Sequence, residues 1–353
     1  MVVSGLDSFL RKTAAEVDAE IENFFPKRVS GRWFSGYLGR MEFGFDSEAV
    51  QRSVAGPVWD FLSRGGKRWR PALMILACEA VGGRKKIVMP FTPIPELIHN
   101  GTIIIDDLED NSTLRRGKPA LHISYGVDVA VNAGNTLYFL PLLKLVQDKG
   151  LSPEKKSAIY DLVVSEMVKL SLGQAMDINW HRGIGQVSEG QYLQMCSFKT
   201  GSLARAAVGL GAILGDSGKK QLSCLLDFAT SIGVAFQIHD DILNVKPQEG
   251  WGKETGDDIK EGKRTLMVIR AFAVLPENEK QRLRFILDSK SNSDAEVKEA
   301  IGLLEKCGAV GYASNAAKAL VSKCWKKLDA SLKASEAKSL LKEFADYVVE
   351  RKI

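Results

Sequence analysis

Residues 96–122, ELIHNGTIIIDDLEDNSTLRRGKPALH, form the stretch around which the rest of the chain is organised. On an α-helix, Asp106 and Asp110 lie one turn apart on the same face, with Asp107 beside them. Three carboxylates this close repel one another unless a cation lies between them. Mg²⁺ is the expected cation, because it takes oxygen ligands and is commonly held by one or two carboxylates together with a substrate phosphate.

Two arginines and an apolar run flank these acids. Arg115 and Arg116 follow closely, and their planar guanidinium groups match phosphate oxygens. An acidic run followed by arginines is in most proteins a solvated helix end. Here, however, Ile103, Ile104 and Ile105 lead directly into the acids, so the carboxylates are expected at the mouth of an apolar wall. The stretch therefore predicts a metal-bridged phosphate site.

Composition bounds the class of protein. The chain has 353 residues, of which 45% are hydrophobic and 26% charged, so it can fold around a sizeable core. The net charge of +5 is spread along the chain, and we expect no nucleic-acid partner. Five cysteines without metal-ligand spacing predict reduced thiols and a cytoplasmic location.

No targeting or membrane segment is expected. The N-terminus carries acids early and has no continuous apolar core, unlike a signal or transit peptide. The apolar segment 127–146 is interrupted by polar residues and a proline, which makes it too polar for a membrane span. The interruptions are Asp128, Asn132, Asn135 and Pro141.

Helical spacing of apolar residues dominates the chain, with almost no strand-like alternation. Segment 31–45 is expected to be a loop, and Asp46 to cap a helix running towards Leu62. The sequence predicts an all-α fold, a single large helical bundle with a central apolar cavity. We expect one domain over residues 1–353, with residues 1–50 as a helical extension. The other expected helices cover residues 6–25, 127–146, 157–176, 192–214, 228–245 and most of 266–353.

Two further regions carry charge next to apolar helices. Segment 63–71, SRGGKRWRP, crowds Lys67, Arg68 and Arg70 before a proline that opens a helix, an arrangement typical of an anion site. In the second region, Asp240 emerges from an apolar helix, just as Asp106 does in the stretch 96–122. Facing each other across a bundle, the two acidic helices would form a cage of carboxylates above an apolar cavity.

Five motifs together resemble the trans-isoprenyl diphosphate synthases. They are GGKRWRP, DDLEDNSTLRRGKP, FKTGS, FQIHDDILN and GKETGDDIKEGK, and the likeness covers about residues 60–330. The resemblance implies the isoprenoid synthase type I fold, a homodimer and a head-to-tail prenyl transfer. Dimethylallyl, geranyl or farnesyl diphosphate would ionise with the help of Mg²⁺, about three ions per active site, and the double bond of isopentenyl diphosphate would attack the cation.

The resemblance also assigns roles residue by residue. The expected metal ligands are Asp106, Asp107, Asp110, Asp240, Asp241 and Asn244. The expected isopentenyl diphosphate ligands are Lys67, Arg70, His99 and Arg116. The expected ligands of the allylic diphosphate are Arg115, Lys199, Lys253 and Lys263. The residues expected to face the carbocation are Thr200 and Gln237. Because released pyrophosphate would take the proton, we expect no side-chain general base.

Some positions depart from the family pattern or stand beside it. Asn244 occupies a position where many members have aspartate, so we expect weaker Mg²⁺ binding and not a dead site. Gln174 and Asp177 match a family position near the metals. Asp257 and Asp258 are interpreted as structural loop acids.

Product length follows from the residues preceding the first acid. Gly101 and Thr102 lie roughly 6 to 7.5 Å below Asp106 along a helix, and both are small. We therefore predict growth past farnesyl, to geranylgeranyl diphosphate or longer if Ile98 does not block the tunnel. On this view Gly101→Phe shortens the product.

Two alternatives remain open at this stage. A class I terpene cyclase shares the helical fold and acidic motifs, but it needs neither GGKRWRP nor His99. A non-catalytic regulatory subunit of a prenyl synthase would tend to lose the first acidic motif, which is intact here. The preferred starter is not fixed by the sequence.

Overall fold

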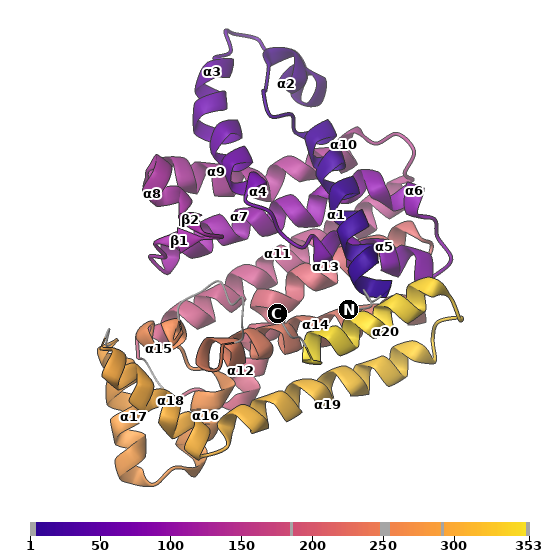
Figure 1. The fold of residues 1–353 in the computed structure, drawn as a ribbon. Coiled ribbons are helices and arrows are strands. Elements are labelled where there is room, and N and C mark those ends of the chain that lie inside the picture. The colour runs from indigo at the N-terminus through magenta and orange to yellow at the C-terminus, as the bar shows by residue number, and fades with distance from the viewer. Residues whose placement is uncertain (1–4, 184–185, 248–254, 291–292, 351–353) are drawn as a thin grey trace.

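The fold is built almost entirely of helices (Figure 1). The computed structural model describes residues 5–183, 186–247, 255–290 and 293–350. The strands within these residues are β1 (Leu114–Arg115) and β2 (Lys118–Pro119), which pair antiparallel. The all-α prediction is confirmed, whereas the organisation as a single domain stays a prediction.

The helices alternate with short turns. In the N-terminal half they are α1 (Gly5–Phe24), α2 (Gly31–Leu38), α3 (Ser47–Val50), the π-helical turn η1 (Gln51–Ala55), α4 (Gly56–Ser63), α5 (Trp69–Ala80), α6 (Lys85–Val88), the 3-10 turn η2 (Met89–Phe91), α7 (Pro93–Glu109), α8 (Leu121–Tyr125), α9 (Val127–Phe139), the 3-10 turn η3 (Leu140–Leu142) and α10 (Leu143–Gln147). In the C-terminal half they are α11 (Pro153–His181), α12 (Glu189–Cys196), the π-helical turn η4 (Ser197–Gly201), α13 (Ser202–Leu214), α14 (Lys219–Val245), α15 (Asp257–Lys260), α16 (Leu266–Val274), α17 (Glu277–Ser289), α18 (Asp294–Lys306), α19 (Ala309–Asp329) and α20 (Glu336–Glu350).

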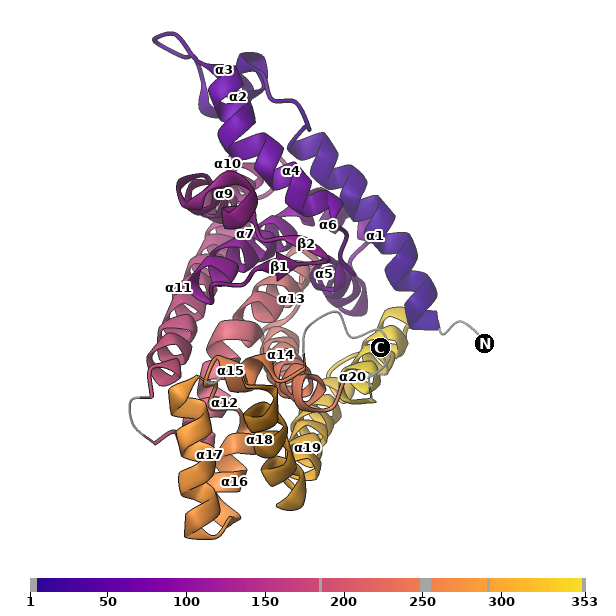
Figure 2. The ribbon, with the colours of Figure 1, turned by 60° about the vertical axis from the view of Figure 1, so that its left-hand side comes forward.

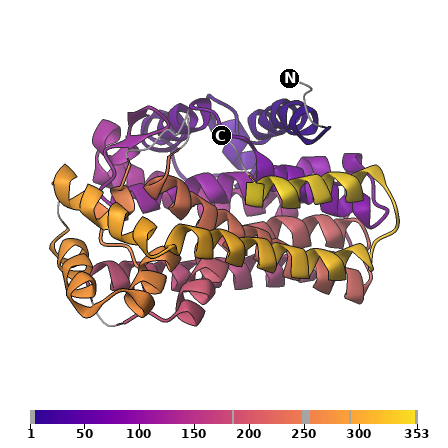
Figure 3. The ribbon, with the colours of Figure 1, turned by 60° about the horizontal axis from the view of Figure 1, so that its bottom comes forward.

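Helix α14 forms the centre of the bundle. It packs against α13 on one side and α19 on the other, and α13 in turn contacts α5 and α11. The fully buried Phe228 and Ile232 of α14 belong to the largest apolar cluster of the described residues. Figure 3 shows α19 and α20, in orange and yellow, lying along the length of the bundle. Burial of such apolar faces is the main stabilising term for helices that would be marginal alone.

The N-terminal extension adds a second apolar cluster that joins α1 and α4 to α7 and α9. Helix α1 runs along one edge of the molecule, and α2 and α3 form a tip away from the C-terminal helices (Figure 2). The prediction of a loop over residues 31–45 is wrong for Gly31–Leu38, which form α2. Ser30 caps this helix by accepting a hydrogen bond from Trp33 N, and Trp33 Nε1 donates to Phe24 O at 2.9 Å. The predicted cap at Asp46 is confirmed, because its carboxylate accepts from two amides of α3.

Two segments of the described chain are long and apolar enough to cross a membrane by length and composition, Val127–Gln147 and Lys219–Val245. The first was expected to be too polar, and that expectation does not hold by this criterion. The first segment is not one continuous α-helix, because Pro141 lies in the 3-10 turn between α9 and α10. The second is α14, the central helix of the bundle, and core helices of soluble proteins also meet this criterion.

Candidate active site

A cavity of about 490 Å³ lies where α7, η4 and α14 converge. Asp106 and Asp110 line it from α7, and Asp240, Asp241 and Asn244 line it from α14. The structure therefore brings the two acidic motifs to one hollow, which we call the acidic cavity. Other lining residues from the predicted site are Arg115, Asp177, Lys199, Gln237 and Lys263.

Lysines occupy the space between the acids. Lys199 Nζ lies 3.1 Å from Asp106 Oδ1 and 2.7 Å from Asp177 Oδ2. Lys263 Nζ lies 3.1 Å from Asp258 Oδ1 and 3.9 Å from Asp110 Oδ2. Burial opposes the charge of Lys199, but the two aspartates outweigh burial and raise its pKa. Both lysines are therefore held protonated at the position where a diphosphate would need positive charge.

The π-helical turn η4 explains how Lys199 reaches the cavity. An insertion of this kind in a helix is often found at functional sites. A β-carbon on Gly173 of α11 would lie 2.4 Å from Lys199 N, so only glycine permits this approach of α11 to η4. The sequence signal for the turn was the polar FKTGS motif within an apolar helix.

Gln174, on α11, binds the first acidic motif. Its Nε2 donates to Asp106 Oδ1 at 3.0 Å and to Glu109 Oε2 at 2.7 Å. Asp177 is likewise placed at the cavity, as the family pattern implied. Asp257 and Asp258 line the cavity too, so their interpretation as purely structural acids is incomplete.

Asp107 lies apart from the other two aspartates of its motif. Its carboxylate is buried in an ion pair with Arg115, whose Nε lies 2.7 Å from Asp107 Oδ1, and it is not among the residues that line the acidic cavity. Asp107 Oδ2 is buried without a hydrogen-bond partner. Adjacent residues on a helix point about 100° apart, so a helix that directs Asp106 and Asp110 to the cavity directs Asp107 elsewhere.

Asp241 is held by neutral donors. Tyr192 Oη donates to its Oδ2 at 2.7 Å and Gln237 Nε2 donates to its Oδ1 at 2.8 Å. Burial, then the charges of Asp258 and Asp240, raise the pKa of Asp241 to about 8. Thr200 Oγ1 in turn donates to Gln237 Oε1 at 2.8 Å, so Thr200 orients Gln237. Thr200 itself is not among the residues that line the acidic cavity.

Asn244 lines the acidic cavity and is also bonded to the start of α15. It is buried, its Oδ1 accepts a hydrogen bond from Asp258 N at 3.1 Å, and its carbonyl accepts from Gly256 N at 2.9 Å. The amide oxygen that is expected to bind metal thus holds the first turn of α15 in this structure. Lys253, expected to hold the allylic diphosphate, lies outside the described residues.

The donor set fits a hard divalent cation that is shared with a phosphate ligand. Among the residues that the structure describes, no three His, Cys, Asp or Glu side chains are close enough to hold a metal alone. Carboxylates from two helices nevertheless face one cavity, and burial, then Asp106, raises the pKa of Asp110. Carboxylate oxygens from two helices around one cavity suit Mg²⁺, which usually completes its shell with water and substrate phosphate oxygens.

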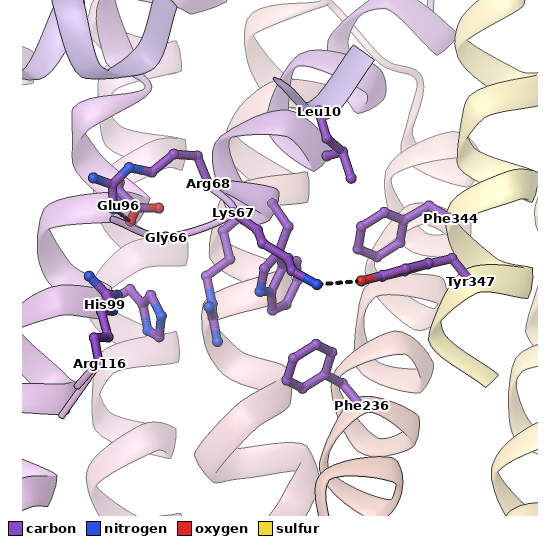
Figure 4. Close-up of a pocket in the computed structure, with 12 residues that line it drawn as sticks. Leu10, Gly66, Lys67, Arg68, Glu96, His99, Arg116, Phe236, Phe344 and Tyr347 are labelled. Carbon is purple, nitrogen blue, oxygen red and sulfur yellow. Dashed lines mark hydrogen bonds and ion pairs between the residues drawn. The ribbon is translucent and has the colours of Figure 1, made fainter. Parts of the chain in front are cut away.

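A second cavity of 180 Å³ contains the residues expected to hold isopentenyl diphosphate (Figure 4). Lys67, Arg70, His99 and Arg116 all line it, and we call it the cationic cavity. Burial, together with Arg116, lowers the pKa of Arg70 to about 10 despite Glu96. Burial and then Arg70 and Arg116 hold the pKa of His99 well below its usual value, so this imidazole is neutral. A concave cluster of cations with one acid is suited to a multivalent anion.

Arg68 shapes the cationic cavity, although the family resemblance assigned it no role of its own. Its Nη1 lies 2.9 Å from Glu96 Oε1, with both side chains buried, and its Nε lies 2.8 Å from Asp18 Oδ1 of α1. Its backbone has a left-handed φ of 48°. The ion pairs therefore hold the GGKR loop in an otherwise unfavourable conformation and tie it to the N-terminal extension.

The residues predicted to set product length lie in three different environments. Gly101 faces α9, and a β-carbon there would lie 2.8 Å from both Gly134 O and Leu137 Cβ. Gly101 thus serves helix packing. The prediction that Gly101→Phe simply shortens the product assumed room for a phenylalanine side chain, and the contact with α9 leaves none at this position. Ile98 is buried in an apolar cluster, while the half-buried Thr102 bonds only to its own helix through Oγ1.

The chain is similar over most of its length to proteins of one known family. The profile of the polyprenyl synthetase family matches residues 51–304. The chain is 38% identical over 291 residues to the short chain isoprenyl diphosphate synthase of Methanothermobacter thermautotrophicus, covering 82% of this chain and 88% of that protein. It is 36% identical over 291 residues to the geranylgeranyl diphosphate synthase of Methanosarcina mazei, covering 81% and 86%.

A solved structure gives the same result. The geranylgeranyl pyrophosphate synthetase of Pyrococcus horikoshii superposes with a TM-score of 0.86 at 30% identity, and 98% of each chain is covered. The match includes the N-terminal extension, which the family profile omits. The chain therefore belongs to the polyprenyl synthetase family, the trans-isoprenyl diphosphate synthases that its five motifs resemble.

Proposed function

We propose that this trans-prenyltransferase condenses isopentenyl diphosphate head-to-tail with dimethylallyl, geranyl or farnesyl diphosphate. The observation that carries the proposal is a pair of cavities, one lined by two carboxylate clusters and the other by cations, to which the consecutive residues Arg115 and Arg116 each contribute one side chain. The first suits a metal-bound diphosphate that must leave, and the second suits a diphosphate that stays bound through arginine and lysine.

In the acidic cavity the protein stabilises the departing diphosphate. Divalent metal, in our proposal about three Mg²⁺ ions held mainly by Asp106, Asp110 and Asp240, would neutralise charge on the leaving group when bound. Lys199, Lys263 and Arg115 already lie among these acids and can turn to the diphosphate oxygens. Released pyrophosphate is then the base that takes the proton.

Gln237 is the group best placed to meet the developing carbocation. It lines the acidic cavity, and its orientation is fixed on one side by Thr200 and on the other by Asp241. An amide oxygen held in this way offers a dipole to the cation without acting as a nucleophile.

The cationic cavity holds the second substrate. Arg70 and Arg116 supply the fixed charge, and the neutral His99 can donate one hydrogen bond to a phosphate oxygen. A terpene cyclase would have no use for this cavity. A purely regulatory subunit would have no use for the acidic one.

We propose geranylgeranyl diphosphate as the shortest final product, with longer chains open. Thr102, one turn before Asp106 on α7, is small and half-buried, which supports a tunnel that is not closed at this residue. The name of the Methanosarcina mazei relative, geranylgeranyl diphosphate synthase, supports the same length.

We further propose a cytoplasmic homodimer. Five free cysteines suit a reducing compartment. Val164, Val168 and Leu172 follow each other at four-residue spacing on α11 and are 55%, 54% and 53% exposed. This apolar stripe on one helix face suits a symmetric contact with a second copy, in which the same patch meets itself.

The test incubates purified protein with labelled isopentenyl diphosphate, one allylic starter at a time, and Mg²⁺. The expected products are elongated prenyl diphosphates, identified by chromatography after dephosphorylation. Cyclised hydrocarbon would identify a cyclase instead. An absence of turnover with every starter would leave the regulatory subunit as the better reading.

A further inference from the structure

The C-terminal helix reaches the cationic cavity. Lys67 and Tyr347 lie 280 residues apart in the chain, yet Lys67 Nζ donates a hydrogen bond to Tyr347 Oη at 2.9 Å (Figure 4). The same ammonium group lies 5.6 Å from the centroid of the tyrosine ring. Tyr347 is also one of the residues that line the cavity, together with Arg70 and Arg116. The contact is therefore part of the cavity wall.

Tyr347 is held in place by an aromatic column. Phe344, one helical turn before it, is buried with its ring centroid 5.8 Å from that of Trp69. Trp69 stacks on Phe236 at 5.2 Å, and the guanidinium carbon of Arg70 lies 4.1 Å above the Trp69 ring. These contacts fix α20 against α5 and α14, so the Tyr347 hydroxyl has a defined position relative to the cavity cations.

The start of α1 adds a further restraint on α20. Leu6 N donates to Glu343 Oε2 at 3.0 Å, and Leu10 of α1 lines the cationic cavity beside Phe344. The N-terminal extension and the C-terminal helix therefore meet at the edge of this cavity.

The chemistry of the pair leaves a donor unused. A lysine ammonium group has no acceptor, so in this hydrogen bond the tyrosine oxygen accepts and its own O–H proton remains available. Two N–H bonds of Lys67 remain available as well. Together the pair offers three donors to a ligand, next to arginines that supply charge. A diphosphate, with several acceptor oxygens, is the ligand that uses all of them.

We propose that Tyr347 is a substrate-binding residue of the cationic cavity. Its hydroxyl group donates a hydrogen bond to the diphosphate of isopentenyl diphosphate and keeps Lys67 directed at the same group. The proposal rests on the proposed function, because it takes isopentenyl diphosphate as the occupant of this cavity. It gives α20 a role in substrate selection, since Tyr347 touches only the substrate that keeps its diphosphate.

The matched variants are Tyr347→Phe and Tyr312→Phe. The first removes only the hydroxyl and keeps the ring packed beside Phe344. The second removes a comparable hydroxyl from α19, where Tyr312 Oη donates to Glu189 Oε2 at 2.6 Å. Tyr312 lines neither of the two cavities. Thermal unfolding of both variants establishes that each is folded.

Titration calorimetry then measures binding of isopentenyl diphosphate in the presence of Mg²⁺ and an unreactive thio analogue of the allylic diphosphate. Tyr347→Phe should weaken this binding about tenfold, because a hydrogen bond to a charged oxygen is lost. In steady-state assays the KM for isopentenyl diphosphate should rise by the same factor. The kcat and the KM for the starter should change little, and Tyr312→Phe should behave as wild type.

A second pair of variants separates direct binding from simple packing. If Tyr347 acts together with Lys67, Tyr347→Phe should weaken binding less in a Lys67→Ala background than in the wild-type background. Unchanged binding by Tyr347→Phe, or equal loss of affinity for both substrates, overturns the proposal. Wild-type protein that does not bind isopentenyl diphosphate overturns it as well. Tight binding weakened by Tyr347→Phe, but without turnover, would uphold Tyr347 and refute the proposed prenyl transfer.

Discussion

Arg115 and Arg116 are consecutive residues whose side chains line different cavities. Arg115 lines the acidic cavity and pairs with Asp107, whereas Arg116 lines the cationic cavity, where its guanidinium carbon lies 5.1 Å from the Phe61 ring centroid. They lie at the turn between β1 and β2, where Arg116 has a left-handed φ of 53°. Arg115 ends the extended strand β1, whereas Arg116 begins the turn in a left-handed conformation, and this change of backbone accompanies the turn of the two side chains to different cavities. The short hairpin can therefore serve both proposed diphosphate sites.

The arginine pair predicts a clean division of kinetic effects. Arg115→Lys should raise the KM for the allylic diphosphate and lower kcat, because a planar fork is replaced by a point charge at the leaving group. Arg116→Lys should raise the KM for isopentenyl diphosphate alone, and about tenfold is expected for each affected constant. Each variant is the control for the other in assays that vary one substrate at a time. Equal effects of both variants on both substrates would contradict the separation of the two cavities.

Asn244→Asp should lower the Mg²⁺ concentration that gives half-maximal activity. One carboxylate oxygen can keep the hydrogen bond from Asp258 N, and the second adds negative charge next to Asp241 in the acidic cavity. Extra carboxylate charge favours a divalent cation. Magnesium titration of initial rates measures the effect. An unchanged titration curve would assign Asn244 to the first turn of α15 and not to metal binding.

Thr102→Phe should shorten the product, whereas Gly101→Phe should unfold the protein at a lower temperature. Thr102 is half-buried with its hydroxyl bonded only to its own helix, so a larger side chain there would narrow the proposed tunnel below Asp106. A side chain on Gly101 would meet the backbone of Gly134, and overpacking of this kind costs at least about 1–3 kcal/mol. Product chromatography and thermal melts of both variants decide the point. Unaltered chain length for a folded Thr102→Phe would remove Thr102 from the tunnel.

What the sequence could predict depended on local spacing. The acids of α7 and α14 and the cations of the GGKR loop are read from short motifs, because helix geometry fixes which neighbours share a face. The position of Asp107 could not be read in this way, since its pairing depends on a hairpin that follows the helix.

Tyr192 was missed because its partner, Asp241, lies 49 residues away and no motif marks the contact. Helix α2 was missed because glycine and aromatic residues have low helix propensity, which the Ser30 cap and aromatic packing override.

Glu96→Gln should destabilise the protein by about 3 kcal/mol, the usual cost of breaking a buried ion pair, because Arg68 would keep a buried charge with a weaker partner. Asp18→Asn is the matched control. It contacts the same guanidinium group, but its side chain is 55% exposed, and exposed pairs contribute less than about 1 kcal/mol. Chemical unfolding of the two variants compares them directly. Equal destabilisation would mean that the Arg68–Glu96 pair does not hold the GGKR loop.

Val168→Glu should convert the proposed homodimer to a monomer. Val168 is the middle residue of the apolar stripe on α11. In a twofold contact centred on this stripe, the middle residue lies closest to the axis, so one substitution buries two like charges in the same interface. Phe285→Glu is the control, because Phe285 is similarly exposed but lies on α17, outside the stripe. Sedimentation velocity should give a dimer for wild type and for Phe285→Glu and a monomer for Val168→Glu. A dimer that survives Val168→Glu would move the interface to another face, and a monomeric wild type would remove the homodimer from the proposal.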